Sequence, residues 1–123
     1  MPGSTAIPGC PDSIDWPAVI KFEGDDELVY VGSGQEWASD ANLHACRYSQ
    51  DDCLVDSSGH KFRLVAAADG VVMPADSGEM ISLQSFIRLL RAHAAAAGQC
   101  CIEKIMTRSV AEGIALVRSL GDA

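Results

Sequence analysis

Two short β-prone runs that flank a tight turn constrain the fold of this chain more than any other feature. The runs are residues 19–23 and 27–31, and Gly24-Asp25 lies in the turn between them. Pro17 stands at the start of the first run, where the missing N–H of proline is tolerated in a strand. We therefore predict an antiparallel hairpin, with the folded domain beginning near Trp16.

The middle of the chain repeats this pattern of β-prone runs separated by turn residues. Residues 53–56, 60–67 and 71–73 are β-prone, and Ser-Ser-Gly and Asp-Gly turns separate them. Asp-Gly readily adopts the positive φ that a tight hairpin turn needs. Phe62, Leu64 and Ala66 alternate with residues that suit solvent, so one face of the middle strand is expected to face a core. We predict a meander that extends the hairpin, in a sheet covered on one side only.

The C-terminal third shows helical periodicity, and we predict that its helices cover one face of the sheet. Apolar residues recur at three- and four-residue spacing over residues 82–97, and Gly98 follows them. Residues 101–106 are predicted to form a strand, and a capping box at residues 109–112 opens a second helix that ends at Gly121. Gly113 falls in the apolar arc of this helix, which indicates a close approach to a neighbouring backbone.

The fold class that follows is α+β. We predict an antiparallel sheet of about five strands with a C-terminal helix-strand-helix packed on one face, forming a single domain over residues 16–121. Residues 1–15 are rich in proline and glycine and are expected to be a flexible N-terminal lead-in.

Charge is distributed unevenly along the chain. Residues 1–81 carry 14 of the 17 acidic and 4 of the 9 basic side chains. Nucleic-acid affinity depends on cations that displace condensed counterions, so nucleic acid is a poor candidate partner. No apolar run approaches the roughly 18 residues that span a bilayer, and no basic residue precedes Lys21 as in a signal peptide. We expect a cytoplasmic protein that binds neither nucleic acid nor membrane.

Five cysteines, an odd number, stand at positions 10, 46, 53, 100 and 101. Without an export signal, reduced thiols are expected. Because no C-x-x-C or H-x₃-H pair is present, the sequence predicts neither a metal site nor a cofactor. His44 near Cys46 and His93 near Cys100 are the pairs that thiol chemistry would use, although a buried structural role is commoner for a histidine placed like His93.

The turn of the first hairpin is crowded with carboxylates, at Glu23, Asp25, Asp26 and Glu27. Their spacing does not match the EF-hand loop. A solvated hairpin tip is the ordinary interpretation, and weak divalent-cation binding or partner docking are the alternatives. Folding alone gives little reason to crowd like charges, so these four residues are our candidate partner-binding site.

Asp76-Ser77-Gly78 matches the D-[ST]-G core of aspartic peptidases, in which paired carboxylates share a proton. Those enzymes are almost wholly β, whereas the C-terminal third of this chain is predicted to be helical. The ordinary interpretation of the tripeptide is a turn before the first C-terminal helix.

The string W-P-x-x-I-K-x-x-G-D-D-E-L, followed by V-D-S-x-G and the later R-A-H and C-x-x-K-I segments, resembles a family of small uncharacterised proteobacterial proteins. The resemblance covers Trp16 to about Leu120. It implies a bacterial cytoplasmic origin, and it lends no activity and no catalytic residue.

These observations favour a cytoplasmic protein-interaction or regulatory module without catalysis. Its expected partner is an unidentified protein or a second copy of the chain. The alternatives are a small carboxylate-dependent hydrolase that uses Asp76 and a weak divalent-cation binder.

Overall fold

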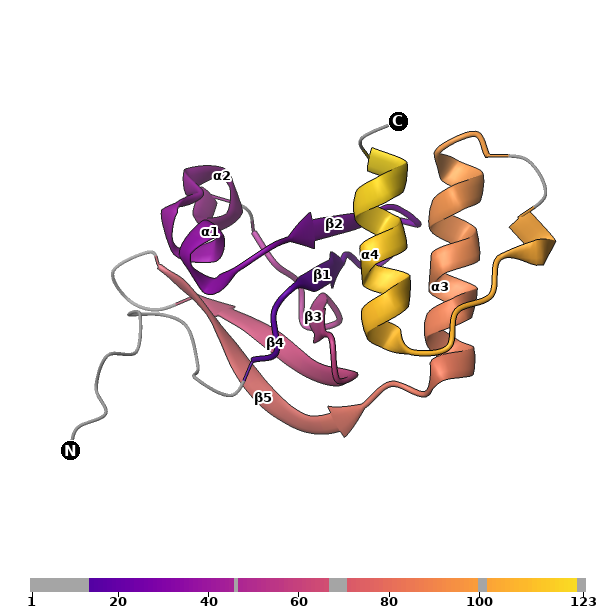
Figure 1. Ribbon diagram of the computed structural model, residues 1–123. Helices are drawn as coiled ribbons and strands as arrows, with labels where there is room; N and C mark the ends of the chain where they lie inside the picture. The colour runs from indigo at the N-terminus through magenta and orange to yellow at the C-terminus, as the bar shows by residue number, and fades with distance from the viewer. Residues whose placement is uncertain (1–13, 46, 67–70, 100–101, 122–123) are drawn as a thin grey trace.

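The computed structural model describes residues 14–45, 47–66, 71–99 and 102–121 (Figure 1). Within these ranges the elements in chain order are β1 (Ala18–Lys21), β2 (Leu28–Val31), α1 (Gly34–Ser39), α2 (Ala41–Ala45), β3 (Cys53–Asp56), β4 (His60–Ala66), β5 (Val72–Met80), α3 (Leu83–Ala96), the 3₁₀ helix η1 (Ile102–Lys104) and α4 (Val110–Gly121). The predicted α+β class is confirmed.

The strands form one antiparallel sheet in the order β2-β1-β3-β4-β5. Ile20 of β1 lies opposite Val29 of β2 on one side and Leu54 of β3 on the other. The predicted first hairpin is therefore present, and β3, β4 and β5 continue the sheet as the predicted meander. β2 and β5 are its edges.

Both faces of the sheet are covered, so the prediction of a one-sided sheet is wrong. Ile20 belongs to a core that α1 and α2 close with Trp37 and Leu43. Val19, the preceding residue, points the other way into a second core with residues of α3 and α4. A strand buried on both faces is continuously apolar rather than alternating, and the segment Ala18-Val19-Ile20 has that composition.

The C-terminal helices pack on one face of the sheet, as predicted (Figure 1). Both helix starts are capped by serine: Ser85 N donates to Ser82 Oγ at 3.1 Å and Glu112 N donates to Ser109 Oγ at 3.1 Å. These caps confirm the helix starts that the sequence predicts.

The segment between these helices is not the predicted strand. Its described part contains the short helix η1, and Arg91 Nε of α3 donates to Ile105 O at 3.2 Å. The two helices lie over the sheet, so the connection between them runs beside α3, where no sheet edge is available for pairing. The segment therefore does not form a strand, although its composition is β-prone, because it has no strand to pair with.

Gly113 lies where α4 meets α3. A Cβ at this position would lie 2.6 Å from Phe86 Cε2 and 3.0 Å from Phe86 Cδ2. Phe86 is fully buried at 0% exposure. The predicted close approach is present, but the neighbour is an aromatic ring of α3 and not a backbone segment.

Residues 1–13 of the expected lead-in lie outside the described residues. Ile14 is buried in the core on the α1 and α2 side. Both backbone polar groups of Asp15 are hydrogen-bonded. Its N–H donates to Asp56 Oδ2 at 3.0 Å, and its carbonyl accepts from Ser57 N at 2.9 Å. The proposed boundary at residue 16 stays a prediction, although Ile14 and Asp15 pack with the domain.

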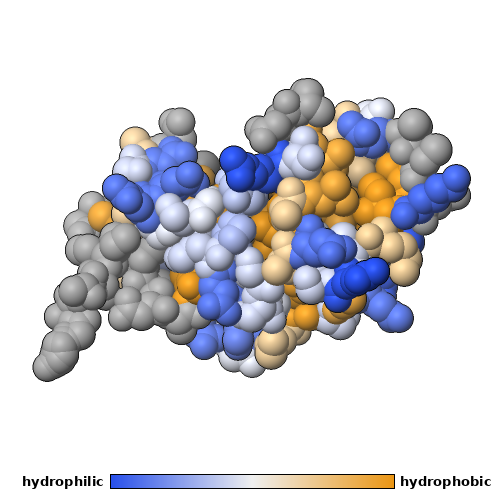
Figure 2. All heavy atoms as spheres, viewed as in Figure 1, coloured by the Kyte–Doolittle hydropathy of each residue, from blue (hydrophilic) through white to orange (hydrophobic). Residues whose placement is uncertain are grey.

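The outer surface of the helical layer is partly apolar. Figure 2 shows hydrophobic residues gathered over α3 and α4, and Met106, in the connection between them, is 70% exposed. Across the part of the chain that the structure describes, no helix combines the length and apolar character needed to cross a membrane.

Candidate functional site

Local hydrogen bonds hold the acidic hairpin turn. Glu23, Asp25, Asp26 and Glu27 are all exposed. The Asp25 carboxylate accepts a hydrogen bond from Glu27 N at 3.0 Å, and Lys21 Nζ donates to the carbonyls of Phe22 and Asp25. The four carboxylates do not converge, and among the described residues no group of three or more histidine, cysteine or acidic side chains could hold a metal ion.

Glu23 faces a second acidic segment that the sequence analysis did not connect to the hairpin. A side-chain hydrogen bond with Asp51, together with the charge of Asp51, raises the pKa of Glu23. Glu23 N donates to Asp52 Oδ1 at 2.6 Å. The pairing of Lys21 with Cys53 places Asp51 and Asp52 beside the hairpin turn, so only a correct β1-β3 register would have revealed them.

Asp52 is the structural member of this acidic segment. It is 5% exposed, and its Oδ2 accepts from Ser49 N at 2.7 Å. Burial acts to raise the pKa of Asp52, but the backbone hydrogen bonds from Glu23 and Ser49 outweigh burial and lower it. Asp52 therefore stays ionised and fixes the backbone on which Glu23 is carried.

A hollow lies beside α3, on the half of the sheet face that the C-terminal helices leave open. Two adjoining parts have volumes of about 320 Å³ and about 490 Å³, and both are lined by Asp51, Cys53 and Lys61. Leu89 of α3 and Met80 at the end of β5 line the larger part. Both volumes fall within the range of about 300–1,000 Å³ that ligand pockets occupy.

The register explains why this half of the face is open. Arg63 pairs with Cys53, so the outward side chains of β4 share the face that α3 and α4 cover further along the sheet. Val65 and Met73 lie opposite each other on β4 and β5 and are 51% and 42% exposed. No described residue of β4 or β5 belongs to the core under α3 and α4.

Charges in the hollow are partly offset. Lys61 Nζ lies 3.8 Å from Glu79 Oε1, an exposed pair of small energetic value. Arg63 lies one strand further from the hairpin than Cys53. The acidic rim is therefore at the hairpin end of the hollow, where Asp51 joins it to Glu23.

Cys53 lacks the environment of a nucleophile. Burial raises the pKa of its thiol, which outweighs the nearby charges of Lys61 and Lys21. The thiol is free and protonated at neutral pH, whereas thiol chemistry needs the thiolate. Cys46 and Cys100, which the sequence analysis paired with His44 and His93, lie outside the described residues.

The two candidate histidines have structural partners. His44 Nε2 lies 3.0 Å from Trp37 O, and Val72 N donates to His44 Nδ1 at 3.0 Å. Leu28 N donates to His93 Nδ1 at 2.9 Å. Each ring therefore joins a helix to a strand, which confirms the structural interpretation of His93.

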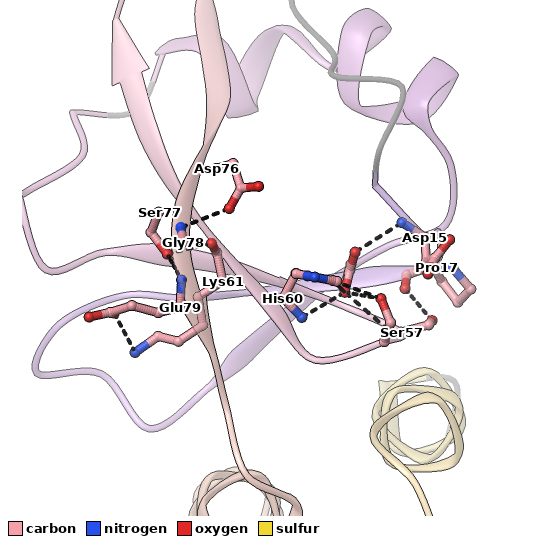
Figure 3. A network of polar contacts seen from close by, with 11 residues as sticks. Asp15, Pro17, Ser57, His60, Lys61, Asp76, Ser77, Gly78 and Glu79 are labelled. Carbon is pink, nitrogen blue, oxygen red and sulfur yellow. Dashed lines mark hydrogen bonds and ion pairs between the residues drawn. The ribbon is translucent and has the colours of Figure 1, made fainter.

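Asp56, Ser58 and His60 form a polar network that superficially resembles a catalytic triad (Figure 3). Asp56 is 0% exposed and accepts from the backbone N–H groups of Asp15, Ser58 and His60. Ser58 Oγ donates its proton to Asp56 Oδ1 at 3.0 Å, and His60 Nδ1 lies 3.1 Å from the same hydroxyl. Because the serine proton points at the aspartate, the imidazole is not placed as its base. The network closes the β3-β4 turn.

Asp76-Ser77-Gly78 is a bulge within β5, so its prediction as a turn before the helix is wrong. Phe62 pairs with Asp76 whereas the preceding Lys61 pairs with Glu79, which leaves Ser77 and Gly78 as extra residues. Asp76 Oδ1 accepts from Gly78 N at 2.8 Å, and Ser77 Oγ donates to Lys61 O at 2.6 Å (Figure 3). Gly78 has a φ of +77°. The three residues shape the edge strand, and this role accounts for the motif.

Comparison with known proteins supports the assignment to an uncharacterised family. Residues 16–117 match the model of a family described as a protein structure with unknown function. The NMR structure of a protein from Shewanella amazonensis is similar over 89% of this chain and 92% of its own, with 28% identity and a TM-score of 0.64. No curated protein matches.

Proposed function

We propose a protein-binding function for this chain, which belongs to the DUF4144 family of unknown function. The occupant that we infer is a basic, partly apolar segment of a partner protein, seated in the hollow beside α3 with its basic side chains on the acidic rim. The rim consists of Glu23, Asp25, Asp26 and Asp51. One observation carries the proposal: Asp51 lines both parts of the hollow, and the next residue, Asp52, accepts a hydrogen bond from Glu23 N at 2.6 Å, which joins the hollow to the acidic hairpin turn.

The hollow suits apolar side chains of a partner. Leu89 and Met80 offer apolar surface at its walls, and Met80 is 60% exposed. α3 already covers the neighbouring half of this sheet face, so a partner helix placed next to α3 would continue the same layer. Burying such exposed side chains is the main favourable contribution in most protein associations.

The rim favours a basic partner. A hydrogen bond to Asp51 and the like charge of Asp51 both raise the pKa of Glu23, as expected for two carboxylates that lie close together. A lysine or arginine between them would relieve their repulsion and add charge-assisted hydrogen bonds. Arg63 lies on the side away from the hairpin, so it would direct the basic residues of the partner toward the rim.

Selection from a random peptide library tests the proposal with a defined probe. We expect enriched peptides to combine basic and apolar residues, and to bind more weakly as salt is raised. Leu89→Asp should weaken the binding of a selected peptide by at least about tenfold, because it introduces a charge into the apolar wall. Gln84→Asp, at an exposed position of the same helix, adds the same charge and serves as the control.

The rim has its own test. Asp51→Asn should lower the affinity and flatten its salt dependence. Selected peptides that are acidic or neutral, or equal binding by Leu89→Asp and Gln84→Asp, would contradict the proposal.

A further inference from the structure

His93 joins the first residue of β2 to α3 through a hydrogen bond that depends on protonation. It is 8% exposed, and Leu28 N donates to its Nδ1 at 2.9 Å. An imidazole nitrogen that accepts a hydrogen bond carries no proton, so the ring is neutral with its proton on Nε2. Leu28 directly follows the acidic turn, so this bond fixes the base of the hairpin to the helical layer.

The groups around His93 set the direction of its titration. Burial lowers its pKa below the ordinary value of 6.5, and the Glu27 carboxylate of the turn acts in the opposite direction. α4 brings apolar Ile114 and Val117 to this core. Among the described residues, other ionisable groups of this layer are Tyr30 of β2, Arg118 of α4, whose guanidinium lies 6.0 Å from the Tyr30 ring centroid, and Arg91 of α3, whose Nε donates to Ile105 O at 3.2 Å.

We propose that His93 is a pH-dependent latch on the acidic hairpin: the neutral ring holds the Leu28 N–H, and the protonated ring releases it and attracts the Glu27 carboxylate. Protonation places a hydrogen on Nδ1, so the N–H of Leu28 and the ring become two donors that face each other. Glu27, the residue before Leu28, is the acidic side chain whose charge acts on His93. The hairpin base therefore has a different preferred arrangement in each protonation state.

The pH range follows from the lowered pKa. The unfolded chain binds the proton more readily than the folded chain, so the contribution of His93 to stability is present above about pH 6.5 and is lost as the pH falls. Release of the hairpin is accordingly expected on the acid side of neutrality.

Residue-specific NMR on the full chain tests the latch. On acidification from about pH 8 to about pH 5, we expect the Leu28 amide signal to shift and its protection against hydrogen exchange to fall, with the same midpoint as the His93 ring nitrogens. His44 holds Val72 N in a similar way, and the separate amide signals distinguish the two sites.

Two variants complete the test. His93→Asn retains an acceptor close to the position of Nδ1 but cannot titrate, so it should keep Leu28 protected at both ends of the range. Glu27→Gln should move the His93 midpoint to lower pH. If His93→Asn does not fold, the wild-type titration decides alone. An unchanged Leu28 amide, or a midpoint that differs from that of His93, would overturn the proposal.

Discussion

Gly113→Ala isolates the contact that fixes α4 against α3. At an exposed helical position, replacing glycine by alanine stabilises a protein by about 1 kcal/mol. At Gly113 the new Cβ would lie 2.6 Å from Phe86 Cε2, a distance that real Cβ atoms do not adopt. Phe86 is fully buried and cannot swing into solvent, so the helices must move apart.

The two effects oppose each other and can be weighed. Overpacking of a core costs about 1–3 kcal/mol, and subtracting the helical gain of about 1 kcal/mol leaves a net loss of roughly 0–2 kcal/mol. We expect the free energy of unfolding to fall by about 1 kcal/mol, measured by urea denaturation with tryptophan fluorescence.

A double-mutant cycle supplies the control. In a Phe86→Leu background the ring is gone, so Gly113→Ala should change sign and become stabilising by up to about 1 kcal/mol. Ala115→Gly, at an exposed position of the same helix, measures how much the helix propensity of alanine over glycine contributes to the free energy of unfolding. Stabilisation in the wild-type background, or the same effect in both backgrounds, would refute the packing argument.

Three further changes test other parts of the fold. Asp56→Ala leaves three partly buried backbone N–H groups without their acceptor, and should lower the free energy of unfolding by about 2–3 kcal/mol in a urea melt; a loss below about 1 kcal/mol would contradict the structural role. Gly78→Ala, at a φ of +77° with no neighbour within 4 Å, should cost about 1–2 kcal/mol from backbone strain alone, and an unchanged melt would argue against the bulge. A chain that begins at Asp15 lacks buried Ile14 and should be about 2 kcal/mol less stable than one that begins at Ile14; equal stability would show that Ile14 does not pack.

Much of the fold follows from local patterns in the sequence. The acidic hairpin, the meander, and the serine caps of α3 and α4 each depend on residues close together in the chain, where turn and capping preferences decide the structure. The bulge in β5 was missed because Asp76-Ser77-Gly78 has the composition of a turn, and only pairing with β4 shows that the strand continues.

The candidate site depends on long-range pairing and was predicted only in part. The carboxylates at Glu23 and Asp25 were identified from their crowding. Asp51 was missed because the β1-β3 register brings it to Glu23 across a long loop. The open half of the sheet face also could not be predicted, because it depends on where α3 lies over the strands.

The most direct test of the central claim is a methyl and amide NMR map of the full chain with a selected basic peptide. We predict that the largest shifts appear at Leu89, Met80 and Asp51, with little change at Trp37 on the opposite face of the sheet. Largest shifts on the α1 and α2 face, or shifts confined to the hairpin turn with Leu89 and Met80 unchanged, would contradict the assignment of the hollow as the binding site.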